Sequence, residues 1–138
     1  MLRRGAILGL MLAALPAQAQ QDFIEGVYLR SPAACEKAKG PDGLQSVFEA
    51  GETAMTASGI EGIEYHCEFM EVHRSARTLG WRVSALCEEP DHGYPETFVI
   101  MRRGEGELAV TAASDLRNED EDGGNSGMWF HCAGVALP

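Results

Sequence analysis

The sequence predicts an all-β domain, a small antiparallel meander that forms a barrel or a sandwich and is stapled by two disulfides. Three observations lead to this prediction. Apolar residues alternate with polar ones along most of the chain, turns rich in glycine and proline recur at short intervals, and four cysteines follow an export signal. The chain has 138 residues and contains neither a repeat nor a linker, which indicates a single domain.

The N-terminus has the pattern of a signal peptide. Two arginines precede an apolar run over residues 5–15, which is shorter than the ~20 residues that a membrane-spanning helix needs. A proline ends this run, and the sequence AQA then offers the small residues at which a signal peptidase cleaves. We therefore expect a cleaved signal peptide over residues 1–19, a single β domain over residues 20–138, no membrane insertion after cleavage, and a periplasmic or secreted location.

The first part of the mature chain is expected to form short strands separated by turns. Strand candidates cover residues 23–30, 44–50 and 53–58. Between the first two, the segment PAACEKAK at residues 32–39 has the composition of one helical turn. The sequence KGPDG at residues 39–43 then predicts a turn, because glycine and proline end regular structure.

The clearest strands lie in the middle of the chain. In IEYHCEFM, residues 63–70, the odd-numbered residues are apolar and most even-numbered ones are polar. In LGWRVSALC, residues 79–87, leucine, tryptophan, valine, alanine and cysteine again fall on one side. Such alternation predicts two half-buried strands with their apolar faces inward. The polar sequence HRSAR between them is the expected hairpin connection.

The last part of the chain continues the meander. Strands are expected at residues 96–103, 107–113 and 128–134. The sequence EPDHGYP at residues 89–95 and GEG at residues 104–106 predict turns before and after the first of these strands. An acidic loop separates the last two strands.

Four cysteines remain after processing, at positions 35, 67, 87 and 132. An even number in an oxidising compartment indicates two disulfides, whereas a zinc site would normally include a closely spaced C-x-x-C pair, which the chain lacks. Two pairings stay open. The sequential scheme, Cys35–Cys67 with Cys87–Cys132, would form first during export, and the nested scheme, Cys35–Cys132 with Cys67–Cys87, suits a hairpin that sets Cys67 opposite Cys87.

Four segments carry a resemblance to a known class of proteins: EGVYLRSPAAC, GIEYHCEF, WRVSALC and the terminal WFHC. This order of aromatic residues and cysteines resembles a class of small exported proteobacterial proteins and covers nearly the whole mature chain. The resemblance implies a β fold with two disulfides and gives no catalytic residues to carry over. In size, compartment and cysteine-stapled β architecture, the chain is also similar in type to bacterial periplasmic lysozyme inhibitors, although it has no inhibitory loop motif.

The charge of the chain constrains its partners. The formal net charge is −10, and removal of a signal peptide with two arginines and no acidic residue makes it −12. Such a protein repels nucleic acid and anionic lipid and attracts cations. We therefore expect a periplasmic binding module that captures a cationic protein or peptide, for example as an inhibitor or as an accessory subunit of an envelope complex. Acidity that only keeps an exported protein in solution is the alternative.

The sequence RNEDEDGGNS at residues 117–126 is the candidate metal site. An EF-hand calcium loop has oxygen ligands at alternate positions, then a glycine, and later a bidentate glutamate. Asn118, Asp120 and Asp122, followed by glycine, match its first half, but a tryptophan occupies the position of the glutamate. Asp115 would complete the coordination in another kind of calcium loop. The alternative function is therefore a periplasmic protein that binds calcium or a transition metal through residues 115–125.

A second group of metal-ligating types lies on one predicted strand. His66, Glu68 and Met70 share its outer face, and His73 would join them if a β-bulge intervened. Copper or zinc accepts such ligands. A mixed polar face without metal is the competing interpretation, because alternate side chains on a flat strand lie about 7 Å apart.

Two aromatic residues on the last strand are the candidate partner-binding residues. Trp129 and Phe130 are adjacent, so they point to opposite faces, and we expect one of them to be exposed as binding surfaces often require. No catalytic residue is predicted. The chain lacks a G-x-S-x-G nucleophile motif, and oxidised cysteines are not thiolate nucleophiles.

Overall fold

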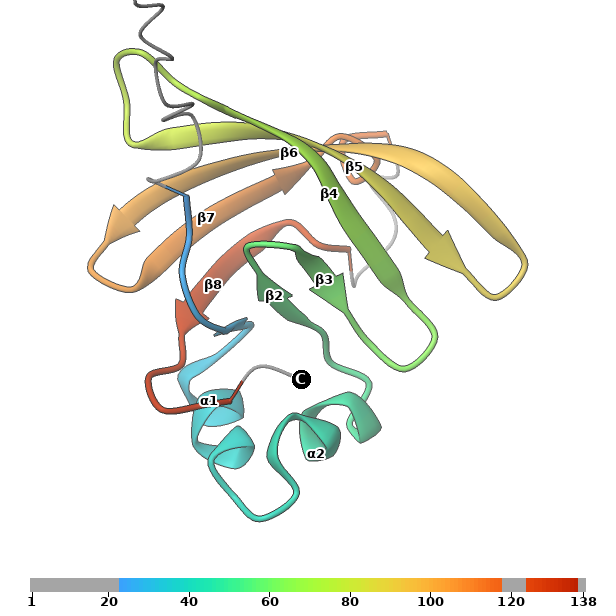
Figure 1. The fold of residues 1–138 in the computed structure, drawn as a ribbon, viewed down its shortest axis with the longest axis vertical. Coiled ribbons are helices and arrows are strands. Elements are labelled where there is room, and N and C mark those ends of the chain that lie inside the picture. The colour runs from blue at the N-terminus through green and yellow to red at the C-terminus, as the bar shows by residue number, and fades with distance from the viewer. Residues whose placement is uncertain (1–22, 118–123, 137–138) are drawn as a thin grey trace, which may run out of the picture.

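The computed structural model describes residues 23–117 and 124–136, and this part of the chain forms a closed barrel of eight antiparallel strands (Figure 1). Each strand pairs with the next in sequence, and the last pairs with the first. The all-β meander predicted from the sequence is therefore confirmed, in its barrel form. The strands are β1 (Tyr28–Leu29), β2 (Ala54–Thr56), β3 (Gly59–Glu61), β4 (His66–Arg74), β5 (Gly80–Glu89), β6 (His92–Gly104), β7 (Glu107–Ala112) and β8 (Gly127–His131).

The long and the short strands occupy different sides of the barrel. In Figure 1 the long strands β4 to β7 form a curved sheet across the top, and β8, β2 and β3 lie beneath it. Two short helices, α1 (Pro32–Ala38) and α2 (Gly43–Glu49), lie at the bottom of the same view. The helices thus lie on the side of the barrel formed by the short strands.

Alternation of side chains builds the barrel interior as the sequence predicts. The buried residues recur at every second position along the long strands: Trp81, Val83 and Ala85 on β5, Phe98 and Ile100 on β6, Leu108 and Val110 on β7. Two residues expected inside are exposed instead, Ile63 by 62 % and Leu79 by 60 %. Each lies in a turn before its strand, where the alternation does not yet apply.

A second apolar cluster fills the space between the helices and the outer face of β1, β2 and β8. Ser31 caps α1, since its hydroxyl accepts a hydrogen bond from Ala34 N at 3.1 Å, and Pro32 opens the helix. The helical turn predicted there is confirmed. The strand predicted at residues 44–50 is wrong, because this segment forms α2 and packs Leu44 and Val47 into the cluster.

Several strand boundaries also differ from the prediction. The strand expected at residues 23–30 is reduced to two residues in β1. A tight hairpin turn joins β2 to β3. The first residue of β3, Gly59, lets this strand lie close to β4, because a side chain at position 59 would overlap the carbonyl oxygen of Cys67. The turn expected at residues 89–95 covers only the two residues between β5 and β6.

The disulfides follow the nested scheme, and the sequential pairing is wrong. Cys67 and Cys87 lie opposite each other on β4 and β5, as the hairpin allows. Cys35 on α1 bonds to Cys132 just after β8 and so fastens the helical layer to the barrel. No free cysteine remains, and two disulfides are typical of proteins that fold outside the reducing cytoplasm.

The predicted signal peptide at residues 1–19 lies outside the described residues. Among the helices that the structure does describe, none is long and apolar enough to cross a membrane.

Candidate functional site

Acidic residues are concentrated in one continuous part of the chain. Residues 40–73 contain no lysine and no arginine, and they form α2, β2, β3 and all but the last residue of β4. None of the acidic side chains in this segment is buried, so their charges add at the surface. They are Asp42, Glu49, Glu52, Glu61, Glu64, Glu68 and Glu71.

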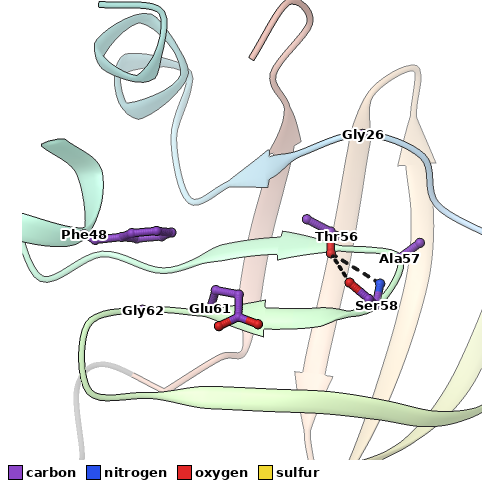
Figure 2. Close-up of a pocket in the computed structure, with 7 residues that line it drawn as sticks. All are labelled: Gly26, Phe48, Thr56, Ala57, Ser58, Glu61 and Gly62. Carbon is purple, nitrogen blue, oxygen red and sulfur yellow. Dashed lines mark hydrogen bonds between the residues drawn. The ribbon is translucent and has the colours of Figure 1, made fainter. Parts of the chain in front are cut away.

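A pocket of about 560 Å³ lies between α2 and the β2–β3 hairpin (Figure 2). Phe48 of α2 forms one side of it, and residues 56–58 at the hairpin turn form the other. Glu61 and Gly62 line the pocket where β3 ends, and Gly26 lines it just before β1. We call this pocket the acidic groove.

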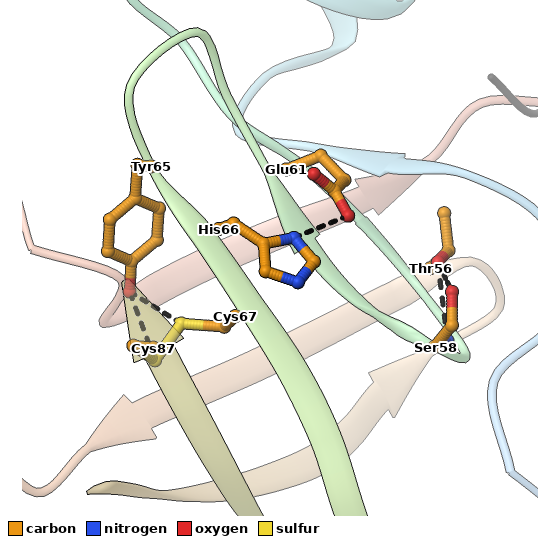
Figure 3. Close-up of polar contacts among 7 residues, drawn as sticks. All are labelled: Thr56, Ser58, Glu61, Tyr65, His66, Cys67 and Cys87. Carbon is orange, nitrogen blue, oxygen red and sulfur yellow. Dashed lines mark hydrogen bonds and ion pairs between the residues drawn. A yellow bond between two sulfur atoms is a disulfide. The ribbon is translucent and has the colours of Figure 1, made fainter. Parts of the chain in front are cut away.

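A histidine orients the carboxylate of the acidic groove. Glu61 on β3 and His66 on β4 are direct neighbours across the strand pair, and Glu61 Oε1 lies 2.8 Å from His66 Nδ1 (Figure 3). Both side chains are about half-exposed. Within the part of the chain that the structure describes, Glu61 Oε2 has no hydrogen-bond partner. Glu61 therefore presents a positioned carboxylate with free acceptor capacity.

Two hydroxyl groups lie at the opposite side of the groove. Thr56 Oγ1 and Ser58 Oγ are 2.9 Å apart, and Ser58 N also donates to Thr56 Oγ1 at 3.3 Å (Figures 2 and 3). Thr56 is buried, whereas Ser58 is exposed. An aromatic ring, a carboxylate and paired hydroxyls thus line one pocket. This set of groups offers a negative charge, an aromatic ring and hydrogen-bond acceptors, which together can hold a cation or a hydrogen-bond donor.

The candidate metal ligands on β4 have other neighbours in the structure. A β-bulge is present between Phe69 and Glu71, His73 Nε2 lies 3.3 Å from Glu71 Oε2, and Met70 is 60 % exposed. His66 is engaged by Glu61, on the neighbouring strand. In residues 23–117 and 124–136, no three histidine, cysteine or acidic side chains are placed to share a metal ion.

The acidic loop is described only at its two ends. Asn118, Asp120 and Asp122 lie outside the described residues. Asp115 is described, and its Oδ2 accepts a hydrogen bond from Ser126 N at 2.8 Å. Asp115 therefore ties the two ends of the loop together, a role that the sequence pattern did not suggest.

The two candidate partner-binding aromatics are not exposed. Trp129 is fully buried inside the barrel, and Phe130 is half-buried beneath the helices. Their side chains do point to opposite faces of β8, as expected for adjacent residues. The expectation of an exposed aromatic is wrong because Trp129 faces the barrel interior and Phe130 packs against the apolar cluster beneath the helices, although Met128 and His131 of the same strand are exposed.

Trp129 instead belongs to a cluster around Arg30. The guanidinium of Arg30 donates to Asn125 O at 2.9 Å and to Ser126 O at 2.7 Å, and it lies 5.0 Å from the centre of the Trp129 ring. Trp129 Nε1 also donates to Asn125 O, at 3.0 Å. Burial lowers the pKa of Arg30, and the nearby carboxylate of Asp115 opposes this change. Arg30 thus anchors the segment that leads from the acidic loop into β8.

Tyr65 closes the same end of the barrel over the buried disulfide. Its hydroxyl lies 2.8 Å from Cys67 Sγ (Figure 3). The same hydroxyl accepts a hydrogen bond from Asn125 Nδ2 at 2.6 Å. Burial raises the pKa of Tyr65 well above its ordinary value of 10.0, and the hydrogen bond with Tyr94 raises it further.

The raised pKa of Tyr65 predicts a loss of stability at alkaline pH. Above about pH 10 the tyrosine ionises in the unfolded chain but stays protonated in the folded one, so the free energy of unfolding falls by up to about 1.4 kcal/mol per pH unit. Tyr65→Phe should lower stability by about 1 kcal/mol at pH 7, through its lost hydrogen bond to Asn125, and should flatten the alkaline decline. Urea unfolding between pH 7 and pH 11 measures both effects, and an unchanged alkaline slope in the variant would contradict the assignment.

Comparisons with protein-family models, with curated proteins and with solved structures return no match for this chain. Its own residues therefore carry the functional assignment.

Proposed function

We propose that this protein is an exported binding module that captures a cationic protein or peptide at the acidic groove. The observation that carries the proposal is the lack of any lysine or arginine at positions 40–73, the segment that supplies most of the groove. A surface with one sign of charge concentrates partners of the opposite sign and speeds their association. A periplasmic or secreted location agrees with the disulfides and with the signal-peptide pattern of residues 1–19.

The placement of the basic residues supports a defined orientation of the partner. The β4–β5 turn and the end of β6 are joined by a hydrogen bond from Arg102 N to Leu79 O. Five arginines lie in or next to these two segments: Arg74, Arg77, Arg82, Arg102 and Arg103. Along β4, His66 beside the groove and Arg74 at the far end are separated by roughly 26 Å, at about 3.3 Å per residue. A cationic partner is therefore attracted to one end of β4 and repelled from the other.

Charge reversal tests whether the groove, rather than net charge, captures the partner. A triple variant of the groove region, Glu61→Lys, Glu64→Lys and Glu68→Lys, should bind a fluorescent peptide of alternating basic residues and glycine at least about tenfold more weakly than the unaltered chain. The matched control changes the net charge equally but at exposed positions elsewhere: Glu36→Lys, Glu105→Lys and Glu107→Lys.

The control variant should lose only a small part of the affinity, and added salt should weaken all binding. Fluorescence anisotropy at two ionic strengths measures these differences. Equal losses in the two triple variants would mean that net charge alone attracts the peptide, and no loss in either would remove the basis of the proposal. Affinity capture from an envelope extract, with the groove variant as the negative bait, would then identify the natural partner.

A further inference from the structure

The acidic groove combines groups that suit one kind of cation better than others. Phe48 is half-buried, since it packs against the apolar cluster beneath the helices while also lining the groove. Figure 2 shows its ring and the carboxylate of Glu61 along the same pocket. A guanidinium is planar and weakly hydrated, so it stacks on an aromatic face, whereas an ammonium is a compact and strongly hydrated charge.

The free acceptor capacity of the Glu61 carboxylate also favours a planar cation with several N–H groups. Each carboxylate oxygen has two lone pairs, so the contact of Oε1 with His66 leaves capacity on both oxygens. A guanidinium can therefore form a two-pronged hydrogen-bonded pair with Glu61, which an ammonium cannot match. Because His66 fixes the carboxylate from the neighbouring strand, little side-chain freedom is lost when the cation binds.

The remaining groups of the groove are acceptors or small. The hydroxyls of Thr56 and Ser58 can accept further N–H groups, and Gly62 lines the groove next to Glu61 without a side chain. The volume of about 560 Å³ accommodates an arginine side chain with part of its backbone, since small-ligand sites span roughly 300–1,000 Å³.

From these observations we infer that the acidic groove holds the side chain of an arginine presented by the partner, stacked on Phe48 and paired with Glu61. This inference rests on the proposed function and names the group that the groove recognises.

Three short peptides that differ in one side chain test the inference. Acetyl-Gly-X-Gly-amide is titrated into the isotopically labelled mature protein, with arginine, lysine or neutral citrulline at X, and binding is followed by NMR. The arginine peptide should bind about tenfold or more tightly than the citrulline peptide, and several times more tightly than the lysine peptide. The shifted amides should be those of residues 56–62 and their neighbours.

Two conservative variants separate the contributions of the ring and the carboxylate. Glu61→Gln keeps the size of the side chain and its contact with His66, and it should weaken the arginine peptide about tenfold or more. Phe48→Leu keeps apolar packing without the aromatic face, and it should abolish the preference for arginine over lysine. Glu107→Gln, at an exposed position of β7 that does not line the groove, is the matched control and should leave the affinities nearly unchanged.

The possible results separate this inference from the proposed function. If the lysine peptide binds as tightly as the arginine peptide, or if Glu61→Gln and Phe48→Leu have no effect, the arginine pocket is overturned. The proposed function would still stand if the groove triple variant bound the cationic peptide more weakly than the control triple variant. If the two triple variants bound that peptide equally well, the proposed function and the arginine pocket would both be overturned.

Discussion

Replacing Cys35 and Cys132 with alanine is expected to lower the free energy of unfolding by about 4.7 kcal/mol. The two cysteines are 97 residues apart in the sequence, so their bond closes a loop that includes almost the whole domain. A long closed loop restricts the unfolded chain more than a short one. In the folded state the same bond holds α1, and with it the helical layer, against the end of β8.

The second disulfide provides the internal comparison. Cys67 and Cys87 are 20 residues apart and already lie on neighbouring, hydrogen-bonded strands, so their replacement by alanine should cost about 3 kcal/mol. Urea unfolding of both double variants measures the difference, after thiol titration of the native protein has shown that no cysteine is free. A Cys67/Cys87 variant that is the less stable of the two would contradict this account, because loop length would then not decide the order.

The barrel strands could be predicted because their sequence pattern and their environment agree. On β5, every second residue from Trp81 to Cys87 is apolar and every one of them is buried. One face of such a strand meets the core and the other meets solvent, so alternation is a direct consequence of the fold. The even number of cysteines likewise predicted two disulfides, although only the barrel register sets Cys67 opposite Cys87.

Helix α2 could not be separated from a strand by composition alone. Leu44, Val47 and Phe48 are spaced by three and four residues, which is the helical period, but the segment LQSVFEA is also short and rich in residues that strands accept. The tertiary contacts decide the outcome, because the helix packs Leu44 and Val47 into the apolar cluster that also contains Ala54 of β2. Packing beneath the helices likewise explains why Phe130 is half-buried, whereas Trp129 is buried because it faces the barrel interior.

The acidic character of the site was predictable, but its geometry was not. The run without lysine or arginine at residues 40–73 is visible in the sequence, although the sequence-based prediction placed the acidic site at residues 115–125. The contact of Glu61 with His66 depends on the register of β3 and β4, and the place of Phe48 depends on how α2 docks. Both result from long-range packing, for which a short stretch of sequence holds no signal.

Trp129→Ala is expected to lower the free energy of unfolding by about 3–5 kcal/mol, because it empties the space of the largest fully buried side chain described in the barrel. The change also removes the ring beneath the Arg30 guanidinium and one of the two donors to Asn125 O. Both losses fall on the segment that leads from the acidic loop into β8, so this end of the barrel should loosen first. Hydrogen exchange should be fastest in β8 and in its neighbour β7.

Trp129→Phe separates packing from hydrogen bonding at the same position. Phenylalanine keeps an apolar ring but cannot donate to Asn125 O, so a smaller loss of about 1–2 kcal/mol is expected. This milder variant also tests the assignment of the residue to the core. Because Trp129 does not line the acidic groove, Trp129→Phe should bind the cationic peptide with unchanged affinity under conditions in which it is fully folded. A loss of affinity in the folded variant would mean that Trp129 contacts the peptide, and it would contradict the burial of this residue within the barrel.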